Sequence, residues 1–95
     1  MNTLGTIRAA LERALPYMRS TACIEYVTDF LVAGDNGGQW SFMDPETALD
    51  GSAANLVYWF CHMRLQPYGN EEFDDALEKV RDSLKDIERE LSKAP

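Results

Sequence analysis

The chain has 95 residues, which suits one domain spanning residues 1–95 and leaves no room for two. Its 16 acidic residues outnumber the 9 lysines and arginines and give a formal net charge of −7. This charge argues against direct binding to DNA or RNA and against docking on anionic lipid, because both need clustered basic side chains. A basic protein or nucleoprotein complex is the kind of partner that the charge would attract.

The first predicted element is an amphipathic helix. Apolar residues recur at spacings of three and four between Leu4 and Met18, which places them on one face. Asn2 or Thr3 can cap its start. The helix is expected to end or kink just before Pro16, since proline lacks the backbone N–H that a helix interior needs.

Residues 20–33 fit two structures. As a helix, the segment buries one apolar stripe, begins at a capping Ser20 or the residue after it, and is closed by Gly34 in the left-handed conformation. As a strand, its β-branched and aromatic residues would form one arm of a hairpin near residues 22–42. We favour the helix and keep the hairpin as the alternative.

Residues 34–51 carry four of the six glycines, one proline and several aspartates and asparagines, which are typical of turns and loops. The same segment also contains Trp40 and Phe42. A loop of this length in a small domain is unusual, and it is often either functional or held down by its own side chains. Both interpretations of the two aromatic residues stay open.

Two more helices are predicted towards the C-terminus. The first runs from about Ser52 to Gln66 and is apolar almost all round. The second begins at a capping Asn70 and reaches about Ser92, a length of ~33 Å at 1.5 Å per residue. Its apolar residues alternate spacings of three and four, as in a coiled-coil seam. The central seam residues are Leu77, Val80, Leu84, Ile87 and Leu91.

These elements predict an all-α fold, a small antiparallel bundle of three to four helices with a long C-terminal helix. The alternative is an α+β fold with the hairpin near residues 22–42. The last helix is long for a domain of this size, so its seam also predicts a homodimer as an alternative use.

No set of residues with recognisable chemistry emerges from the sequence. The single histidine, His62, lies in an apolar run, and on a helix its neighbour Cys61 points about 100° away. Two separated cysteines and one histidine do not supply the four ligands that zinc needs. Asp35 and Glu46 have the spacing of the outer ligands in a calcium loop, but the residues between them do not match. We therefore expect no catalytic residue, no metal and no cofactor.

Targeting signals are also not recognised in this sequence. The N-terminus lacks a basic region followed by a continuous apolar stretch, and no apolar run approaches the ~20 residues that span a bilayer. A cytoplasmic location is expected, which would be the host cytoplasm if the chain is encoded by a phage.

The most informative feature is an asymmetry of charge. Residues 20–63 contain no lysine or arginine and carry six acidic residues. Aromatic anchors beside acidic residues are typical of a surface that binds a basic protein. The residues that we predict for this partner-binding patch are Asp35, Trp40, Phe42, Asp44, Glu46 and Asp50.

The sequence thus predicts a non-enzymatic inhibitor or antagonist that blocks a basic, nucleic-acid-handling protein. Two biological settings suit such a chain. One is an immunity protein or antitoxin that neutralises a nuclease, and the other is a phage anti-defence protein of the anti-CRISPR-like type. The alternative is a homo-oligomeric helical scaffold or a small-ligand sponge.

Overall fold

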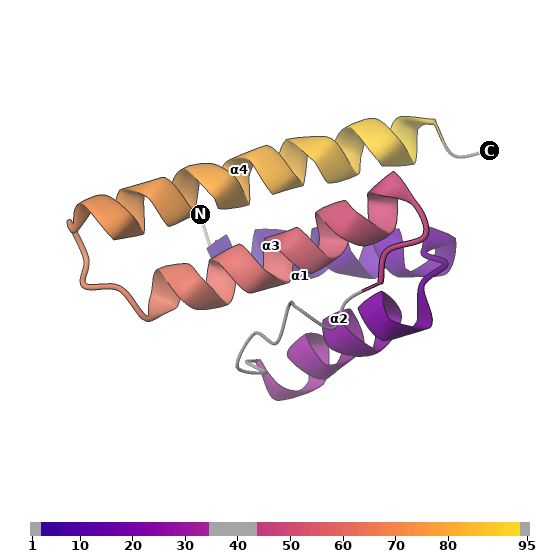
Figure 1. Ribbon diagram of the computed structural model, residues 1–95, viewed down its shortest axis with the longest axis horizontal. Helices are drawn as coiled ribbons and strands as arrows, with labels where there is room; N and C mark the ends of the chain where they lie inside the picture. Colours follow the sequence, from indigo (N-terminus) through magenta and orange to yellow (C-terminus); the bar gives the residue numbers. More distant parts are fainter. Residues whose placement is uncertain (1–2, 35–43, 94–95) are drawn as a thin grey trace.

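The described part of the chain, residues 3–34 and 44–93 of a computed structural model, is built from helices (Figure 1). The elements are α1 (Thr3–Ala14), the 3₁₀ turn η1 (Leu15–Tyr17), α2 (Thr21–Ala33), α3 (Ala48–Arg64) and α4 (Glu71–Ser92). Neither of the two described ranges contains a strand. The all-α prediction and the long last helix are therefore confirmed. The hairpin alternative is wrong for residues 22–33, and its remaining residues 35–42 lie outside the described part.

The boundaries of α1 and α2 follow from local chemistry that the sequence already indicates. Helix α1 ends at Ala14, and Pro16 lies in the 3₁₀ turn that follows. The Ser20 side chain caps α2 by accepting a hydrogen bond from the backbone N–H of Cys23, at 3.2 Å. Gly34 closes the helix with φ +80°, a left-handed conformation that glycine adopts without strain.

Helix α3 begins four residues before the predicted start at Ser52. Its cap is Thr47, whose side chain accepts the Asp50 N–H while the Asp50 carboxylate accepts the Thr47 N–H. This reciprocal pair is a capping box, and it places Gly51 inside the helix rather than in the preceding loop. The end of the helix at Arg64 agrees with the prediction within two residues.

Helix α4 has the predicted cap and the predicted end. Its apolar face, however, packs on its own chain, with Val80 and Ile87 almost fully buried in the core. These two positions of the predicted seam have no exposed surface for a second copy, and the homodimer itself stays a prediction. Leu77, Leu84 and Leu91 are half-buried against the same core.

Helices α1 and α2 run in opposite directions, as do α3 and α4, whereas α2 and α3 pack together and run in the same direction (Figure 1). Arg8, early in α1, donates to the carbonyl of Leu31 near the end of α2, at 2.7 Å. Arg64, at the end of α3, donates to the carbonyl of Gly34 at the end of α2, at 2.9 Å. The ends of α2 and α3 therefore lie side by side, as expected for neighbouring helices that run in the same direction.

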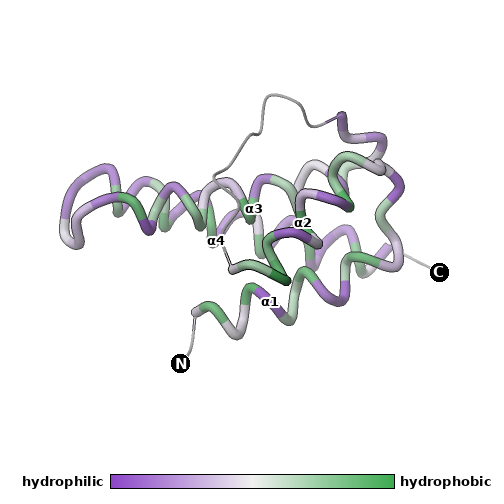
Figure 2. Tube along the Cα trace, turned by 90° about the horizontal axis from the view of Figure 1, so that it is seen from below, coloured by the Kyte–Doolittle hydropathy of each residue, from purple (hydrophilic) through white to green (hydrophobic). Residues whose placement is uncertain are grey.

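The core lies where the four helices face one another, and hydrophilic residues dominate the far end of the α3–α4 hairpin (Figure 2). Phe30 of α2 meets Phe60 of α3 edge to face, with ring centroids 5.8 Å apart. The molecule measures 40 × 25 × 20 Å, and its long axis follows α4 (Figure 1). The end of the hairpin therefore lies at one extremity of the long axis.

Candidate functional site

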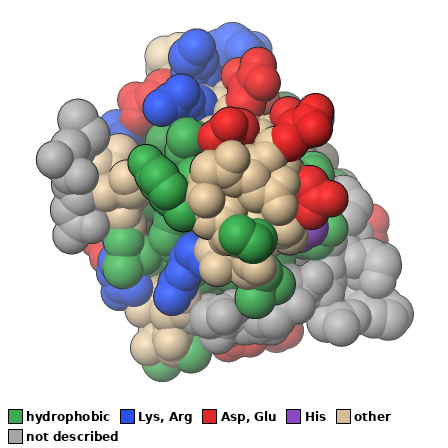
Figure 3. Space-filling view, turned by 90° about the vertical axis from the view of Figure 1, so that its left-hand side faces the viewer, with side chains coloured by type: hydrophobic (Ala, Val, Ile, Leu, Met, Phe, Trp, Pro, Cys, Tyr) green, Lys and Arg blue, Asp and Glu red, His purple; other side chains and the backbone are tan. Residues whose placement is uncertain are grey.

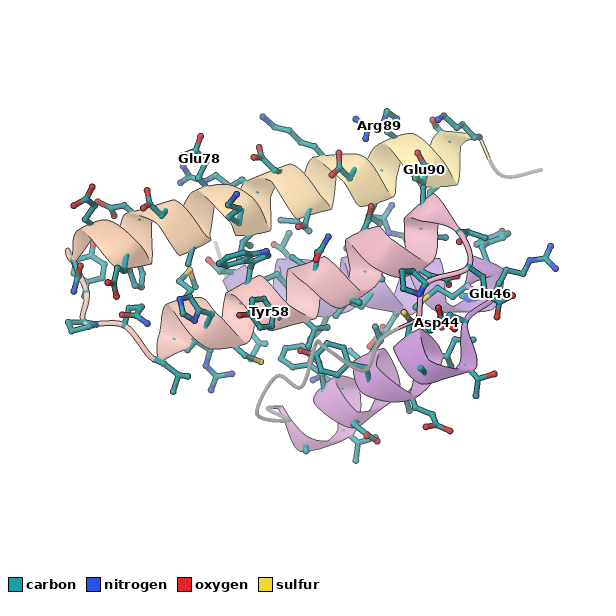
Figure 4. All side chains as sticks on the ribbon, in the orientation of Figure 1. Asp44, Glu46, Tyr58, Glu78, Arg89 and Glu90 are labelled. Carbon is teal, nitrogen blue, oxygen red and sulfur yellow. The ribbon has the colours of Figure 1, made fainter. Side chains whose placement is uncertain are left out.

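The predicted partner-binding patch divides into three parts in the structure. Asp44 and Glu46 are exposed and lie beside the beginning of α2 and α3 (Figure 4). Asp35, Trp40 and Phe42 lie outside the described residues, so the role of the two aromatic side chains stays a prediction. Asp50 is buried, and its inclusion in a surface patch was wrong.

Asp50 connects the start of α3 to the segment that joins α1 and α2. Its Oδ1 accepts the backbone N–H of Arg19 at 2.8 Å, and its Oδ2 accepts that of Ser20 at 3.1 Å. The same Oδ2 accepts the N–H groups of Glu46 at 3.0 Å and Thr47 at 2.9 Å. Its side chain has no exposed surface. This carboxylate is therefore an internal tether between two segments that are 30 residues apart.

The protonation of Asp50 is set by two opposing effects. Burial raises the pKa of the carboxyl group, but the four backbone N–H donors stabilise the charged form and together lower its pKa below the usual value. The group is thus ionised and fully hydrogen-bonded at neutral pH. Such a group stabilises the fold and has no exposed lone pair for a partner.

Most acidic side chains on the surface lack a compensating cation. Asp35 aside, the described part of the chain contains fifteen acidic residues, and ion pairs within 4.0 Å involve three of them, Asp86, Glu88 and Glu90. All three belong to the C-terminal half of α4 (Figure 4 labels Glu90). The acidic residues of α2 and of the first half of α4 form no ion pair in this part of the structure.

Several basic side chains are directed at the fold itself rather than at these acids. Arg8 and Arg64 donate to carbonyls in the last turn of α2, where the negative end of the helix dipole favours cations. The Arg64 guanidinium also lies over the Phe60 ring, 5.3 Å from its centroid. Lys79 lies over the ring of Trp59, with its Nζ 5.6 Å from the centroid. The negative potential of the neighbouring surface is therefore left largely unneutralised.

The side chains that could carry covalent or acid–base chemistry are part of the packing. His62 is half-buried, stacks on Tyr58 with ring centroids 6.1 Å apart, and meets Trp59 edge to face. Cys23 and Cys61 are both buried. Burial raises the pKa of the Cys23 thiol, which keeps it protonated and a poor nucleophile.

An open depression of about 570 Å³ lies between η1 and the end of α4. Three charged residues line this depression. Glu90 is already paired with Lys93 at 3.2 Å, and the third residue is Arg19. Across residues 3–34 and 44–93, no three His, Cys, Asp or Glu side chains are grouped as metal ligands. Over the same residues, no helix combines the length and apolar character needed to span a membrane.

Comparison with known proteins identifies no relative: no protein-family model, no curated protein and no solved structure matches this chain. We therefore infer the function from the geometry and charge of the molecule itself.

Proposed function

We propose that this protein acts by binding, without catalysis, to a basic surface of another protein. The observation that carries the proposal is the set of exposed carboxylates without ion pairs, on α2, beside its start and on the first half of α4. Uncompensated charge of one sign speeds and orients association with a surface of opposite charge. It also repels nucleic acid and anionic lipid, which makes a protein the better partner.

An antagonist of a nucleic-acid-handling protein would fit this surface, since such proteins expose clustered lysines and arginines. An immunity protein directed at a nuclease and a phage protein directed at a defence complex are two settings of this kind. In both, the acidic surface would occupy the basic site that otherwise binds phosphates. The scaffold alternative receives less support, because two of the five seam residues, Val80 and Ile87, are buried in the chain's own core.

The test is a capture experiment that compares the wild-type chain with a charge-reduced variant, which carries six fewer negative charges. The variant combines six substitutions of exposed residues: Glu25→Gln, Asp29→Asn, Asp44→Asn, Glu46→Gln, Glu71→Gln and Glu72→Gln. Both immobilised chains are exposed to nuclease-treated lysate of the native cell and washed with rising salt. Circular dichroism of the variant controls for folding.

The expected result is a basic protein that the wild-type chain retains, that salt releases, and that the charge-reduced variant retains at least about tenfold more weakly. Retention that is equal for both chains, or that does not respond to salt, would contradict the proposal. Turnover of a substrate by the purified chain would contradict its non-catalytic part.

A further inference from the structure

We propose that the turn between α3 and α4 is the docking end of the molecule, and that it fits a protein surface with an apolar pocket bordered by lysine or arginine side chains. We call this end the hairpin tip. Its defining residues are Leu65, Tyr68, Glu71, Glu72, Asp75 and Glu78. The inference rests on the proposed function and names the surface that would perform it.

The first observation is the exposure of large apolar side chains at the tip. Leu65 is 77% exposed and Tyr68 is 91% exposed. Within the described residues, the other exposed large hydrophobic side chains are Val32 at 83% and Tyr17 at 47%. Exposed to this extent, Leu65 and Tyr68 contribute little to the stability of the monomer, because stabilisation follows the apolar area removed from water. Figure 3 looks onto this end and shows hydrophobic side chains around the turn.

The second observation is that the tip is ordered by its own contacts. Asn70 donates its backbone N–H to the carbonyl of Pro67 at 3.1 Å, and Gly69 takes up the left-handed conformation with φ +85°. The Tyr68 ring meets the Phe73 ring edge to face, with centroids 5.3 Å apart. A preformed aromatic side chain loses little conformational freedom on binding, and tyrosine is among the residues that contribute most to protein interfaces.

The third observation is a rim of negative charge beside these apolar side chains. From Glu71 to Glu78, α4 carries five acidic residues and no basic residue. Acids in the first turn are expected from the helix dipole, but Asp75 and Glu78 lie beyond that turn. The two cations that border the tip, Arg64 and Lys79, each lie over an aromatic ring of α3, at 5.3 and 5.6 Å. Acidic side chains gather on the α4 side of the tip (Figure 3), and Glu78 projects outward from α4 (Figure 4).

Together these observations select the chemistry of the partner. Apolar anchors surrounded by charged residues are the usual anatomy of a protein interface. A second copy of this chain would place the five carboxylates against five others, and nucleic acid or anionic lipid would add further negative charge. A cationic protein surface with an apolar pocket would accept the Tyr68 side chain and attract the carboxylates beside it.

The test uses a synthetic peptide of alternating arginine and leucine as probe, followed by the amide shifts of the ¹⁵N-labelled full chain. A glutamate–leucine peptide of the same length controls for apolar binding alone. The tip variant is Leu65→Ala with Tyr68→Ala, and the matched control is Val32→Ala, which removes an equally exposed apolar side chain on α2. A second pair of double variants tests the acidic side chains. The tip variant combines Glu71→Gln and Glu72→Gln, and its control on α2 combines Glu25→Gln and Asp29→Asn.

The arginine–leucine peptide is expected to shift amides from Leu65 to Glu78. The tip variants should weaken its binding about tenfold or more, whereas the α2 variants should change it less than about twofold. Shifts centred on α2, equal losses for tip and control variants, or no binding of this peptide would overturn the assignment to the tip. The capture experiment with the native partner tests the proposed function separately, and none of these peptide results changes its outcome.

Discussion

Helices α3 and α4 both start with a polar cap and carry acidic side chains in the first turn, one in α3 and three in α4, yet the two beginnings have different environments. At the start of α3, Asp50 is fully buried and accepts four backbone hydrogen bonds. At the start of α4, Glu71 and Glu72 are exposed, and the Asn70 side chain caps the helix by accepting the Glu72 N–H at 3.0 Å. The difference arises because a second segment, between α1 and α2, packs against the first of these helix ends and supplies two of the donors.

This comparison separates two uses of negative charge in one small protein. A carboxylate that receives donors from two segments holds the fold together and is hidden from any partner. Carboxylates that receive none remain at the surface and determine the electrostatic potential there. Substitutions at the two helix ends should therefore affect different properties, stability at α3 and binding at α4.

The largest effect on stability is expected for Asp50→Asn. The amide replaces one acceptor oxygen with a donor that faces backbone N–H groups, so buried donors lose their partner. We expect a loss of about 3 kcal/mol in the free energy of unfolding and a melting temperature about 15 °C lower. Urea denaturation measures the loss, and Asp44→Asn provides the same chemical change at an exposed position. Equal stability of the two variants would mean that the Asp50 carboxylate does not tether the two segments.

The pH dependence of stability should identify the same carboxylate. Because the pKa of Asp50 is lowered in the folded state, its contribution is present in full above the unfolded value of about 3.9 and is lost as the pH falls through the folded value. The difference in unfolding free energy between wild type and Asp50→Asn should be constant from pH 7 to about pH 5 and shrink below about pH 4. A difference that grows on acidification would contradict the direction of the pKa shift.

A smaller effect is expected when the caps themselves are removed. Thr47→Ala eliminates one half of the capping box and should cost about 1.5 kcal/mol, whereas Asn70→Ala at the exposed end should cost about 0.7 kcal/mol. Chemical denaturation of both variants gives the comparison directly. If Asn70→Ala proves the more damaging, the start of α4 is more important for stability than its exposure indicates.

The parts of the fold that could be predicted from the sequence are those set by local chemistry. Ser20, Gly34 and Asn70 act within a few residues of themselves, and each was placed correctly as a cap or a helix end. The start of α3 was placed too late because the glycine-rich composition outweighed a local signal, the spacing of Thr47 and Asp50, which was present in the sequence and not used. The spacing of Thr47 and Asp50 predicts a helix that starts at Ala48.

The parts that could not be predicted depend on contacts between distant segments. Nothing near Asp50 in the sequence indicates that the N–H groups of Arg19 and Ser20 reach it, so it was counted as a surface acid. The parallel course of α2 and α3 likewise depends on tertiary packing. At the hairpin tip, the exposure of Leu65 and Tyr68 was missed, because an apolar residue in a turn has the same sequence pattern whether it is covered or not.

A gain in stability is expected for Gly51→Ala, within the first turns of α3. The glycine has no left-handed conformation to preserve, and a Cβ added there would lie 3.9 Å from the Cβ of Pro45, an ordinary contact. Alanine should therefore stabilise the helix by about 0.5–1 kcal/mol, since it restricts the unfolded chain and favours helix. Thermal unfolding measures the gain, and a loss would show that the start of α3 is packed more tightly than this contact indicates.

The smallest effect is expected for Glu71→Gln combined with Glu72→Gln. These side chains interact with the helix dipole from exposed positions, so their removal should cost about 0.5 kcal/mol at low salt and close to nothing at about 1 M salt, where charges are screened within about 3 Å. Urea denaturation at both salt concentrations tests this, with Asp50→Asn as the salt-insensitive reference. A loss near that of Asp50→Asn, unchanged by salt, would mean that these acids are also tethers. A small, salt-sensitive loss of stability, together with a weaker partner affinity of the same variant, would mean that the unpaired acids at the start of α4 serve binding rather than folding.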